Sequence, residues 1–406
     1  MPNTNTNNNF RSVNSNNFRS VNNNNNNKTK TLRAAIKKSM QFVFRRSNTV
    51  NNRLVFAKKM HAYFKKAGAR SCLGVYHNRL AMIDRHGDPI VAFDEINRIG
   101  SKSAYGLAHL HRGRGPYVPF KFASKITAFD ESCEIEIRLL DAMTSAVMRH
   151  FTPNFPVTYF RMACRAPCAF PQCPRVIRNK PYAVIVSELA DADLQNWMVE
   201  TRTVEEHQSV LVQLVLSIYA FQQLGVLHRD THLGNFLVHR VTPGGYWRYV
   251  VRNPANENEP FYFYLKNCGW LLVIWDPGMA EEWRHPRWVS DFSRPLRLLN
   301  SVATDPSYVA RGMKPLPRSV GDRVANVVDL LQGTYAKYSA PRDDVHPLDV
   351  FAYQFATLCA TAWFPKVVTR GNENVLKNGR VRYTAPGDLL NVRPYLNLND
   401  LPNTFG

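Results

Sequence analysis

The first 83 residues of the chain lack any acidic side chain, since the first carboxylate belongs to Asp84. Residues 1–70 carry fifteen Lys or Arg. The rest of the chain contains the other 37 of the 52 basic residues together with all 31 acidic residues. The formal net charge of +21 is therefore concentrated at the N-terminus, and the remainder of the chain is only mildly basic.

Long apolar runs are also missing. The best candidate for a membrane-spanning helix, 209–224, is interrupted by Gln213, Gln222 and Gln223, and a span requires roughly 18–20 apolar residues. The N-terminus is polar and Asn-rich, unlike a secretory signal. The seven cysteines are odd in number and lack a framework spacing, which is typical of a reducing compartment. We therefore expect an intracellular protein of the cytoplasm or nucleus, without a transmembrane segment.

Apolar residues are nonetheless sufficient for a globular core, at 45% of the chain, with aromatic residues at 12%. Low complexity is confined to residues 1–27, where the heptapeptide Asn-Asn-Phe-Arg-Ser-Val-Asn occurs at 8–14 and again at 16–22. Such a segment has too little apolar surface to offset the entropy lost on ordering. We predict that residues 1–50 form a disordered, Asn-rich and basic tail.

The stretch 28–70 interleaves Lys and Arg with apolar residues, and residues 53–67 have helical spacing. This charge indicates binding of nucleic acid or of an acidic membrane through residues 1–70. The alternative is a solvated helix packed on the domain behind it, and the sequence leaves both open. In either case residues 51–92 are expected to form a basic helix and strands that lead into the folded domain.

The rest of the chain divides into a strand-rich and a helix-rich part. Strands are predicted at 73–76, 80–84, 90–93, 99–100, 105–110, 118–126, 157–159 and 183–188, with one helix at 128–148. Helices are predicted at 191–200, 204–223, 293–303, 320–333 and 347–363. We expect an α+β fold of two lobes that meet near residues 188–192, with a small β-rich lobe at 93–188 and a larger helical lobe at 189–406.

The most informative stretch is 225–238, Gly-Val-Leu-His-Arg-Asp-Thr-His-Leu-Gly-Asn-Phe-Leu-Val. Asp230 follows His228 and Arg229, and Asn235 comes after four further residues. One short loop of this kind delivers two groups to one place, an Asp that accepts the proton of an attacking hydroxyl and an amide that holds a metal ion beside it. The alternative is a chance His-Arg-Asp in a surface turn.

Polar residues elsewhere in the chain could complete a site around this loop. An apolar strand ends at Asp276, before a Gly turn, where a carboxylate could hold magnesium against phosphates. Upstream, Lys125 lies on a predicted strand and could contact phosphates, with Lys121 as a competitor. On the following helix, Glu136 could pair with the lysine; Glu134 competes but lies on a different helix face. Glu136 is preferred because it directs the two leucines that follow it into the core.

A phosphate-covering loop is expected between two predicted strands near residues 98–106. Its candidates are Gly100, Ser101, Lys102 and Gly106, since backbone amides there could cradle a phosphate and Lys102 would add charge. A pair of glycines on its own is equally typical of an ordinary turn.

These elements, taken in order, resemble the protein-kinase-like fold over roughly residues 93–300. The resemblance is strongest to the divergent Ser/Thr protein kinases of large DNA viruses, which would place the protein in a host cell or a virion. Enzymes of this fold transfer the γ-phosphoryl group of ATP with the help of Mg²⁺.

The resemblance implies a role for each candidate residue. Lys125 would hold the α- and β-phosphates, oriented by Glu136. Asn235 and Asp276 would hold the metal, and Asp230 would deprotonate the acceptor hydroxyl.

The same resemblance places the adenine of ATP near Glu188 and Ala190, with Ser187 at the back of the pocket.

Three positions depart from the family pattern. Pro277 replaces the usual Phe after Asp276, which puts regulation by flipping of that loop in doubt. His232 stands where Ser/Thr kinases usually carry Lys, and the residues around it resemble small-molecule phosphotransferases of the aminoglycoside and choline kinase type. Asp291, the candidate for the Asp that starts the next large helix, follows so closely that the peptide-binding activation segment is reduced.

A cysteine cluster forms a separate candidate site. Cys164, Cys168 and Cys173 lie in a Pro-rich insertion and could bind zinc with His150 as a fourth ligand, although their spacing differs from a standard pair of Cys-x-x-Cys knuckles. The alternative is buried or free thiols in a loop.

We predict from the sequence an ATP-dependent protein Ser/Thr kinase that acts on protein substrates. One alternative is a small-molecule phosphotransferase. Another is an inactive kinase-like scaffold that binds nucleic acid or membrane through its basic arm. The retention of Lys125, Asp230, Asn235 and Asp276 argues against the scaffold, because a binding module has no need of all four.

Overall fold

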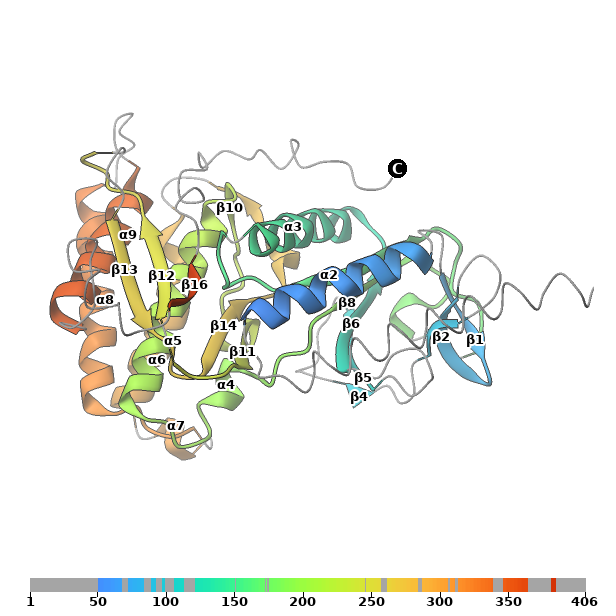
Figure 1. Cartoon of the computed structure of the whole chain (residues 1–406), viewed down its shortest axis with the longest axis horizontal. Helices are drawn as coiled ribbons and strands as arrows, with labels where there is room; N and C mark the ends of the chain where they lie inside the picture. The colour runs from blue at the N-terminus through green and yellow to red at the C-terminus, as the bar shows by residue number, and fades with distance from the viewer. Residues whose placement is uncertain are drawn as a thin grey trace, which may run out of the picture.

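The computed structural model describes residues 50–67, 72–83, 89–92, 97–98, 106–112, 121–149, 151–171, 173, 175–244, 246–256, 261–283, 287–305, 307–310, 313–338, 346–363 and 381–384. The predicted disordered tail, apart from residue 50, lies outside these ranges. Within them the chain is a mixed α and β protein: in Figure 1, α8 and α9 lie on the left with β12 and β13, whereas α2 and α3 lie nearer the right, with β6 and β8.

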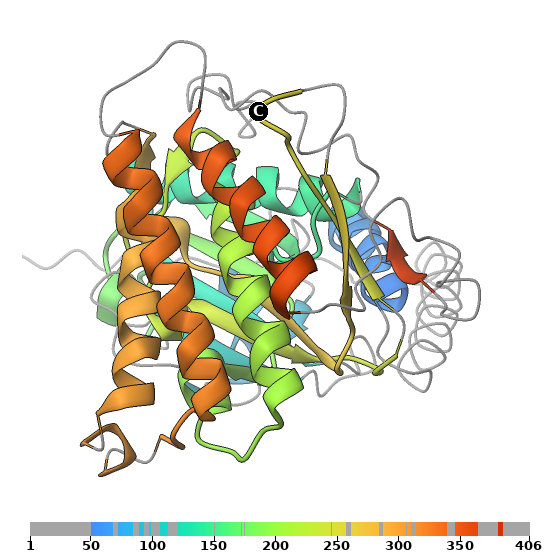
Figure 2. The same ribbon diagram turned by 90° about the vertical axis from the view of Figure 1, so that its left-hand side faces the viewer.

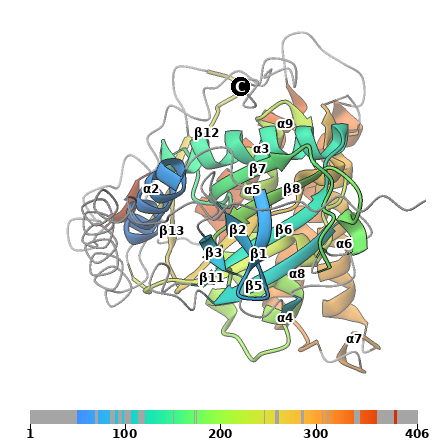
Figure 3. The same ribbon diagram turned by 90° about the vertical axis from the view of Figure 1, so that its right-hand side faces the viewer.

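The small lobe is built on a five-stranded antiparallel sheet. Its strand order is β4-β5-β6-β8-β7, with β4 at Asn97–Arg98, β5 at Gly106–Arg112, β6 at Lys121–Ala128, β8 at Tyr182–Ser187 and β7 at Thr158–Cys164. Strand β8 is buried along its whole length, as expected for a central strand with apolar residues throughout. Helix α3 (Glu131–Met148) lies along the sheet (Figure 3).

Helix α3 begins where the sequence provides a cap. The Asp130 carboxylate accepts a hydrogen bond from the Cys133 amide at 3.0 Å, which satisfies one of the free N–H groups of the first turn. Ile137, Leu140 and Val147 follow at helical spacing, and all three are buried against the core.

A basic helix and a small sheet precede this lobe, as predicted for residues 51–92. Helix α2 spans Val50–Ala67, and the sheet contains β1 at Cys72–Tyr76, β2 at Arg79–Ile83 and β3 at Pro89–Ala92. Leu54, Ala57 and Met60 are buried in the core, so the apolar face of α2 packs on the domain, while Lys58 is exposed. The packed helix, one of the two alternatives for this region, is therefore the arrangement in the structure.

The large lobe is mainly helical. Its long helices lie side by side in Figure 2: α5 at Val204–Gln222, α6 at Val289–Thr304, α8 at Arg318–Lys337 and α9 at Pro347–Leu358. Helix α5 begins with a reciprocal capping box between Thr203 and Glu206 and is buried over most of its length. Shorter helices are α4 (Leu194–Trp197) and α7 (Ser307–Ala310), with single helical turns at Arg175–Ile177, Leu233–Asn235, Pro277–Met279 and Cys359–Trp363. No described helix is long and apolar enough to cross a membrane.

Small sheets carry the loops that face the small lobe. One has the order β14-β11-β9, from Trp270–Ile274, Phe236–Arg240 and Ala192–Asp193; another pairs β10 (Val226–Leu227) with β15 (Glu281–Glu282). The helix predicted for 191–200 is wrong in its first part, because residues 192–193 pair with β11 and only the four residues of α4 are helical.

A hairpin inserted between β11 and β14 was not predicted. Its strands β12 (Tyr246–Val251) and β13 (Phe261–Lys266) are antiparallel, and β16 (Val381–Thr384) adds to β12 in parallel. Both strands are rich in aromatic and β-branched residues, which is the signal that would have identified them.

The lobes are joined by a buried amide, that of Asn154. Its Nδ2 donates to the Leu272 carbonyl at 2.7 Å and to Gln213 Oε1 at 3.2 Å. Its Oδ1 accepts from the Tyr249 hydroxyl at 2.9 Å, and its backbone carbonyl accepts from the Ile274 amide at 3.0 Å. The segment that leads from α3 to β7 is therefore tied to α5, β12 and β14. The division of the chain into lobes at residues 188 and 189 stays a prediction.

We expect Asn154→Ala to lower the free energy of unfolding by about 3 kcal/mol, because it leaves the partners of a fully buried amide unsatisfied. Urea denaturation at 25 °C measures this loss. Gln195→Ala removes an exposed amide from α4 and should change stability by less than about 0.5 kcal/mol. Equal effects of the two substitutions would show that Asn154 does not join the lobes.

Candidate active site

The site is organised around the buried ammonium group of Lys125 on β6. Its Nζ lies 2.7 Å from Glu136 Oε1 and 2.6 Å from Asp276 Oδ1. Side chains alternate along a strand, so Lys125 is on the face opposite to Phe122 and Ile126. The structure thus brings together three residues predicted from separate parts of the sequence.

The charges of these groups depend on one another. Burial alone would lower the pKa of Lys125, but the neighbouring carboxylates of Glu136 and Asp276 raise it above its ordinary value, so the lysine is charged. Burial raises the pKa of Glu136 despite the lysine. Burial would also raise the pKa of Asp276, but Lys125 holds it below its usual range. The result is a cation held between two carboxylates of unequal acidity.

The choice of Glu136 over Glu134 agrees with the packing of α3. Glu136 is buried together with Leu139 and Leu140, whereas Glu134 is only half-buried. The side chain of Lys121, the competitor on β6, lies outside the described residues.

The loop that contains Asp230 is held by Asp291, the third residue of α6. The Asp291 carboxylate accepts from the amides of His228 at 2.8 Å and of Arg229 at 2.9 Å. It also accepts from the side-chain amide of Gln222 at 3.0 Å. Arg229 adopts a positive φ of 67°, a conformation that costs energy for a residue with a side chain. These hydrogen bonds offset that cost and fix the loop.

His228 ties the same loop to the end of β14. Its Nε2 donates to the Trp275 carbonyl at 2.8 Å, directly before Asp276. Burial lowers the pKa of His228, so the ring is neutral. Asp276 has a left-handed backbone with φ of 61°, which turns its side chain out of the strand direction.

Asp230 and Asn235 face each other across the loop. Asn235 Nδ2 donates to the Asp230 carbonyl at 2.8 Å and to Asp230 Oδ2 at 3.2 Å. The other carboxylate oxygen, Oδ1, accepts from Arg294 Nη1 at 2.6 Å. His232 Nε2 lies 3.6 Å from Oδ2. Arg294 was missed in the sequence, although it stands one helical turn after Asp291 and so lies on the same helix face.

Asn235 and Asp276 lie at neighbouring strand ends, because β11 and β14 are antiparallel with Phe236 opposite Ile274. The Trp275 amide donates to the Asn235 carbonyl at 2.8 Å. One amide oxygen and one carboxylate suit Mg²⁺, which keeps several waters and phosphate oxygens in its shell. The described residues contain no group of three His, Cys, Asp or Glu that could form an all-protein metal site.

The predicted phosphate-covering loop is placed only at its end. Gly106 is the first residue of β5, opposite Thr127, whereas Gly100, Ser101 and Lys102 lie outside the described residues.

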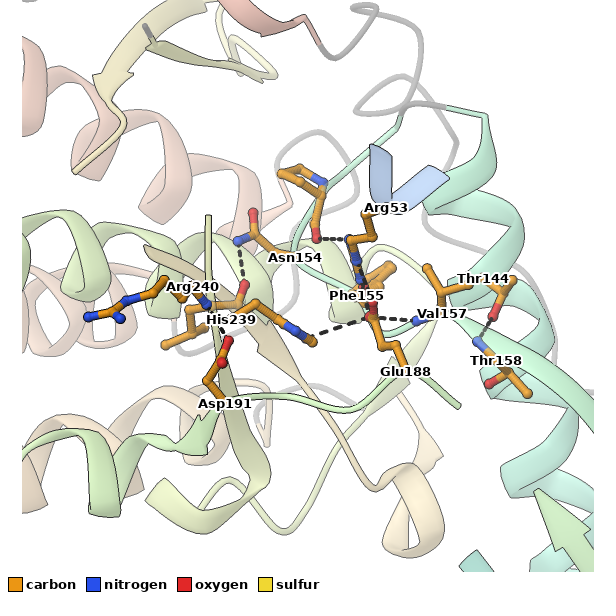
Figure 4. Close-up of polar contacts among 12 residues, drawn as sticks. Arg53, Thr144, Asn154, Phe155, Val157, Thr158, Glu188, Asp191, His239 and Arg240 are labelled. Atoms are coloured by element: carbon orange, nitrogen blue, oxygen red, sulfur yellow. Dashed lines mark hydrogen bonds and ion pairs between the residues drawn. The ribbon is translucent and has the colours of Figure 1, made fainter. Parts of the chain in front are cut away.

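The predicted adenine region is the connection between β8 and β9. Ser187 and Glu188 are buried, and Ala190 is half-buried. The Glu188 carboxylate is bound by Arg53 and by the Val157 amide (Figure 4). The placement of the adenine near Glu188 and Ala190 stays a prediction.

The cysteine cluster does not form the zinc site that the sequence allowed. Cys164 on β7 forms a disulfide with Cys72 on β1, and Cys168 forms one with Cys173, so none of the three cysteines of the cluster has a free thiol to bind a metal. His150 lies outside the described residues. These bonds also depart from the unpaired thiols expected for a reducing compartment; the partner of Cys164 is 92 residues away, and no local spacing indicates it.

We expect Asp291→Asn to destabilise the catalytic loop, because its amide group would point N–H donors at the backbone N–H groups of His228 or Arg229. The free energy of unfolding should fall by about 3 kcal/mol, and the amides of residues 226–230 should exchange hydrogen faster. Asp322→Asn, an exposed change on α8, serves as the control. Unchanged exchange in Asp291→Asn would contradict this role.

The chain is similar to known proteins over part of its length. No protein-family model matches the chain. A protein of Frog virus 3 (isolate Goorha), "Putative serine/threonine-protein kinase 019R", is 28% identical over 190 residues, which are 46% of this chain and 19% of that protein. The chain thus matches about a fifth of the length of this curated relative. The crystal structure of a kinase domain superposes on 48% of this chain and 57% of its own, with 11% identity and a TM-score of 0.31.

The match to this viral protein supports a protein-kinase-like relationship for the chain.

Proposed function

We propose that this protein transfers the γ-phosphoryl group of ATP to a Ser or Thr hydroxyl of a protein substrate. The observation that carries the proposal is the position of Lys125, whose ammonium group contacts both Glu136 and Asp276. A buried lysine between a helix carboxylate and a strand-end carboxylate is suited to hold nucleotide phosphates beside a metal ion. Asp230 and Asn235 lie on the loop next to that strand end.

Each residue contributes a separate step. Lys125 binds the phosphates, and Glu136 keeps its ammonium group in place. Asn235 and Asp276 hold Mg²⁺, which neutralises charge on the phosphate oxygens as the bond breaks. Asp230 orients the acceptor hydroxyl and accepts its proton. The protein itself takes part in little covalent chemistry, so positioning and electrostatic stabilisation account for the rate of phosphoryl transfer.

Arg294 is suited to hold Asp230 in its orientation. The Arg294 guanidinium is half exposed and donates to one carboxylate oxygen of Asp230, while Asn235 donates to the other. The carboxylate is therefore fixed by two donors and still a third exposed, which leaves it open to an acceptor hydroxyl.

Small-molecule phosphotransfer is the second candidate, because the segment after Asp276 is short. Its strand β15 pairs with β10, directly before the catalytic loop, and α6 begins at Val289. Little chain is left there to bind an extended peptide. Assays with both protein and small-molecule acceptors distinguish the two candidates.

We expect magnesium-dependent binding of ATP, because Asn235 and Asp276 offer too few ligands to hold the metal without phosphate. Nucleotide that binds only the folded state should stabilise it by about 2.7 kcal/mol at a hundredfold excess over the dissociation constant. Thermal unfolding with ATP and Mg²⁺, with ATP and EDTA, and with Mg²⁺ alone measures this. An equal rise in melting temperature with ATP and Mg²⁺ and with ATP and EDTA would contradict the metal site.

We expect Asp230→Asn to impair phosphoryl transfer alone and Asp276→Asn to impair nucleotide binding as well. Asp230→Asn removes the base but neither phosphate ligand nor metal ligand, so ATP affinity should change little while phosphoryl transfer falls by roughly 10²–10⁴. Asp276→Asn should also weaken magnesium-dependent nucleotide binding. Transfer from labelled ATP to mixed acceptors gives the rates. Equal rates in wild type and Asp230→Asn would refute the proposed base and favour a nucleotide-binding scaffold.

A further inference from the structure

The guanidinium group of Arg53, on helix α2, binds two segments of the small lobe at once (Figure 4). Its Nε donates to Glu188 Oε2 at 2.6 Å, and its Nη2 donates to Glu188 Oε1. Its Nη1 donates to the Pro153 carbonyl at 2.9 Å, and Nη2 also donates to the Phe155 carbonyl. A planar group with five donors in a fixed geometry is suited to such a junction.

Glu188 is held from other directions as well. Its Oε1 accepts from the Val157 amide at 2.9 Å, and its own amide donates to the Val157 carbonyl at 3.0 Å. The ring of His239, on β11, lies 3.6 Å from the same carboxylate. The segment after α3 and the connection between β8 and β9 therefore share one polar cluster, of which Arg53 is the charged centre.

The far end of the connection is fixed to the large lobe. The Asp191 amide donates to the Val238 carbonyl at 3.0 Å, and the Asp191 carboxylate accepts from the Arg240 amide at 2.6 Å. Leu189 and Ala190 lie between these two anchors and are half-buried. The path of their backbone is thus set at residue 188 by α2 and at residue 191 by β11.

The charges in the cluster require Arg53. Burial would raise the pKa of Glu188, but Arg53 lowers it below its ordinary value, so the carboxylate is ionised. Burial lowers the pKa of His239, which leaves the ring neutral. The Glu188 side chain is only 7% exposed, and a carboxylate so far from water is stable only with its cation.

We propose that Arg53 is a positioning residue for the nucleotide base: helix α2 fixes the 188–191 backbone at the place where the adenine of ATP binds. This inference rests on the proposed function, because it takes the connection between β8 and β9 as the adenine site. Arg53 does not touch the reacting phosphates, which are bound near Lys125 and Asp276. Its loss should therefore weaken base recognition and leave the chemistry of the bound complex intact.

The test compares Arg53→Met with wild type in the full chain, and Lys58→Met as a control that removes an exposed charge from the same helix. We expect the KM for ATP to rise about tenfold in Arg53→Met, with kcat at saturating ATP within about twofold of wild type. Arg53→Lys should recover only part of the affinity, because an ammonium group cannot reproduce the fork of donors. Lys58→Met should match wild type.

A ligand without a base separates positioning from general damage. Inorganic tripolyphosphate with Mg²⁺ uses the phosphate site alone, so its inhibition constant should be the same in wild type and Arg53→Met. Hydrogen exchange at residues 153–157 and 187–191 should become faster in Arg53→Met and not in Lys58→Met. Equal weakening of ATP and tripolyphosphate would overturn the inference, as would an unchanged KM for ATP.

Arg53→Met leaves Glu188 as an unpaired buried carboxylate and is expected to be less stable. The double variant Arg53→Met with Glu188→Gln removes both charges and keeps an oxygen that accepts from the Val157 amide. It should show the same rise in the KM for ATP, and a wild-type KM in this variant would refute the positioning role. A wild-type protein that neither binds nor hydrolyses Mg-ATP would instead refute the proposed function, and the hydrogen-exchange comparison would still report whether Arg53 holds the 188–191 segment.

Discussion

The buried charge of Lys125 is the constraint on which the site depends. An ammonium group without water must be matched by anions, and Glu136 and Asp276 supply them from a helix and from a strand end. If either carboxylate moves away, the buried cation loses one of its two counter-charges. The angle of α3 to the sheet and the position of the strand end after β14 are therefore coupled, and the two lobes meet in a defined geometry.

Buried polar side chains extend this coupling away from the phosphates. Asn154 binds β14 from the segment after α3, Asp291 binds the loop before Asp230, and Arg53 binds the connection between the lobes. Arg53 and Asp291 satisfy backbone groups in irregular segments, and Asn154 satisfies a carbonyl of the edge strand β14. Asp230 is thus carried on a loop whose backbone is fixed by a buried side chain from a distant element. We expect the loss of any one of these side chains to shift the catalytic residues without removing any of them.

Much of this site follows from local sequence pattern. Glu136 is expected from helix spacing and Asp276 from an apolar strand that ends in a Gly turn, whereas Lys125 is expected from the resemblance to the protein-kinase-like fold. The partners that fix the loops have no such signal: Arg53 and Glu188 are 135 residues apart, and Cys72 and Cys164 are 92 apart. Their pairing depends on how α2 and β1 pack on the small lobe, which periodicity does not report. The β12–β13 hairpin was not predicted, although its aromatic and β-branched residues are typical of strands.

The most direct test of this account is a crystal structure of the protein with Mg²⁺ and a non-hydrolysable ATP analogue. The account predicts phosphate oxygens on the Lys125 ammonium group, the metal ion on Asn235 and Asp276, and an intact pair between Lys125 and Glu136. The adenine should lie against the backbone of residues 188–190. A nucleotide bound elsewhere, with Lys125 still enclosed by both carboxylates, would contradict it.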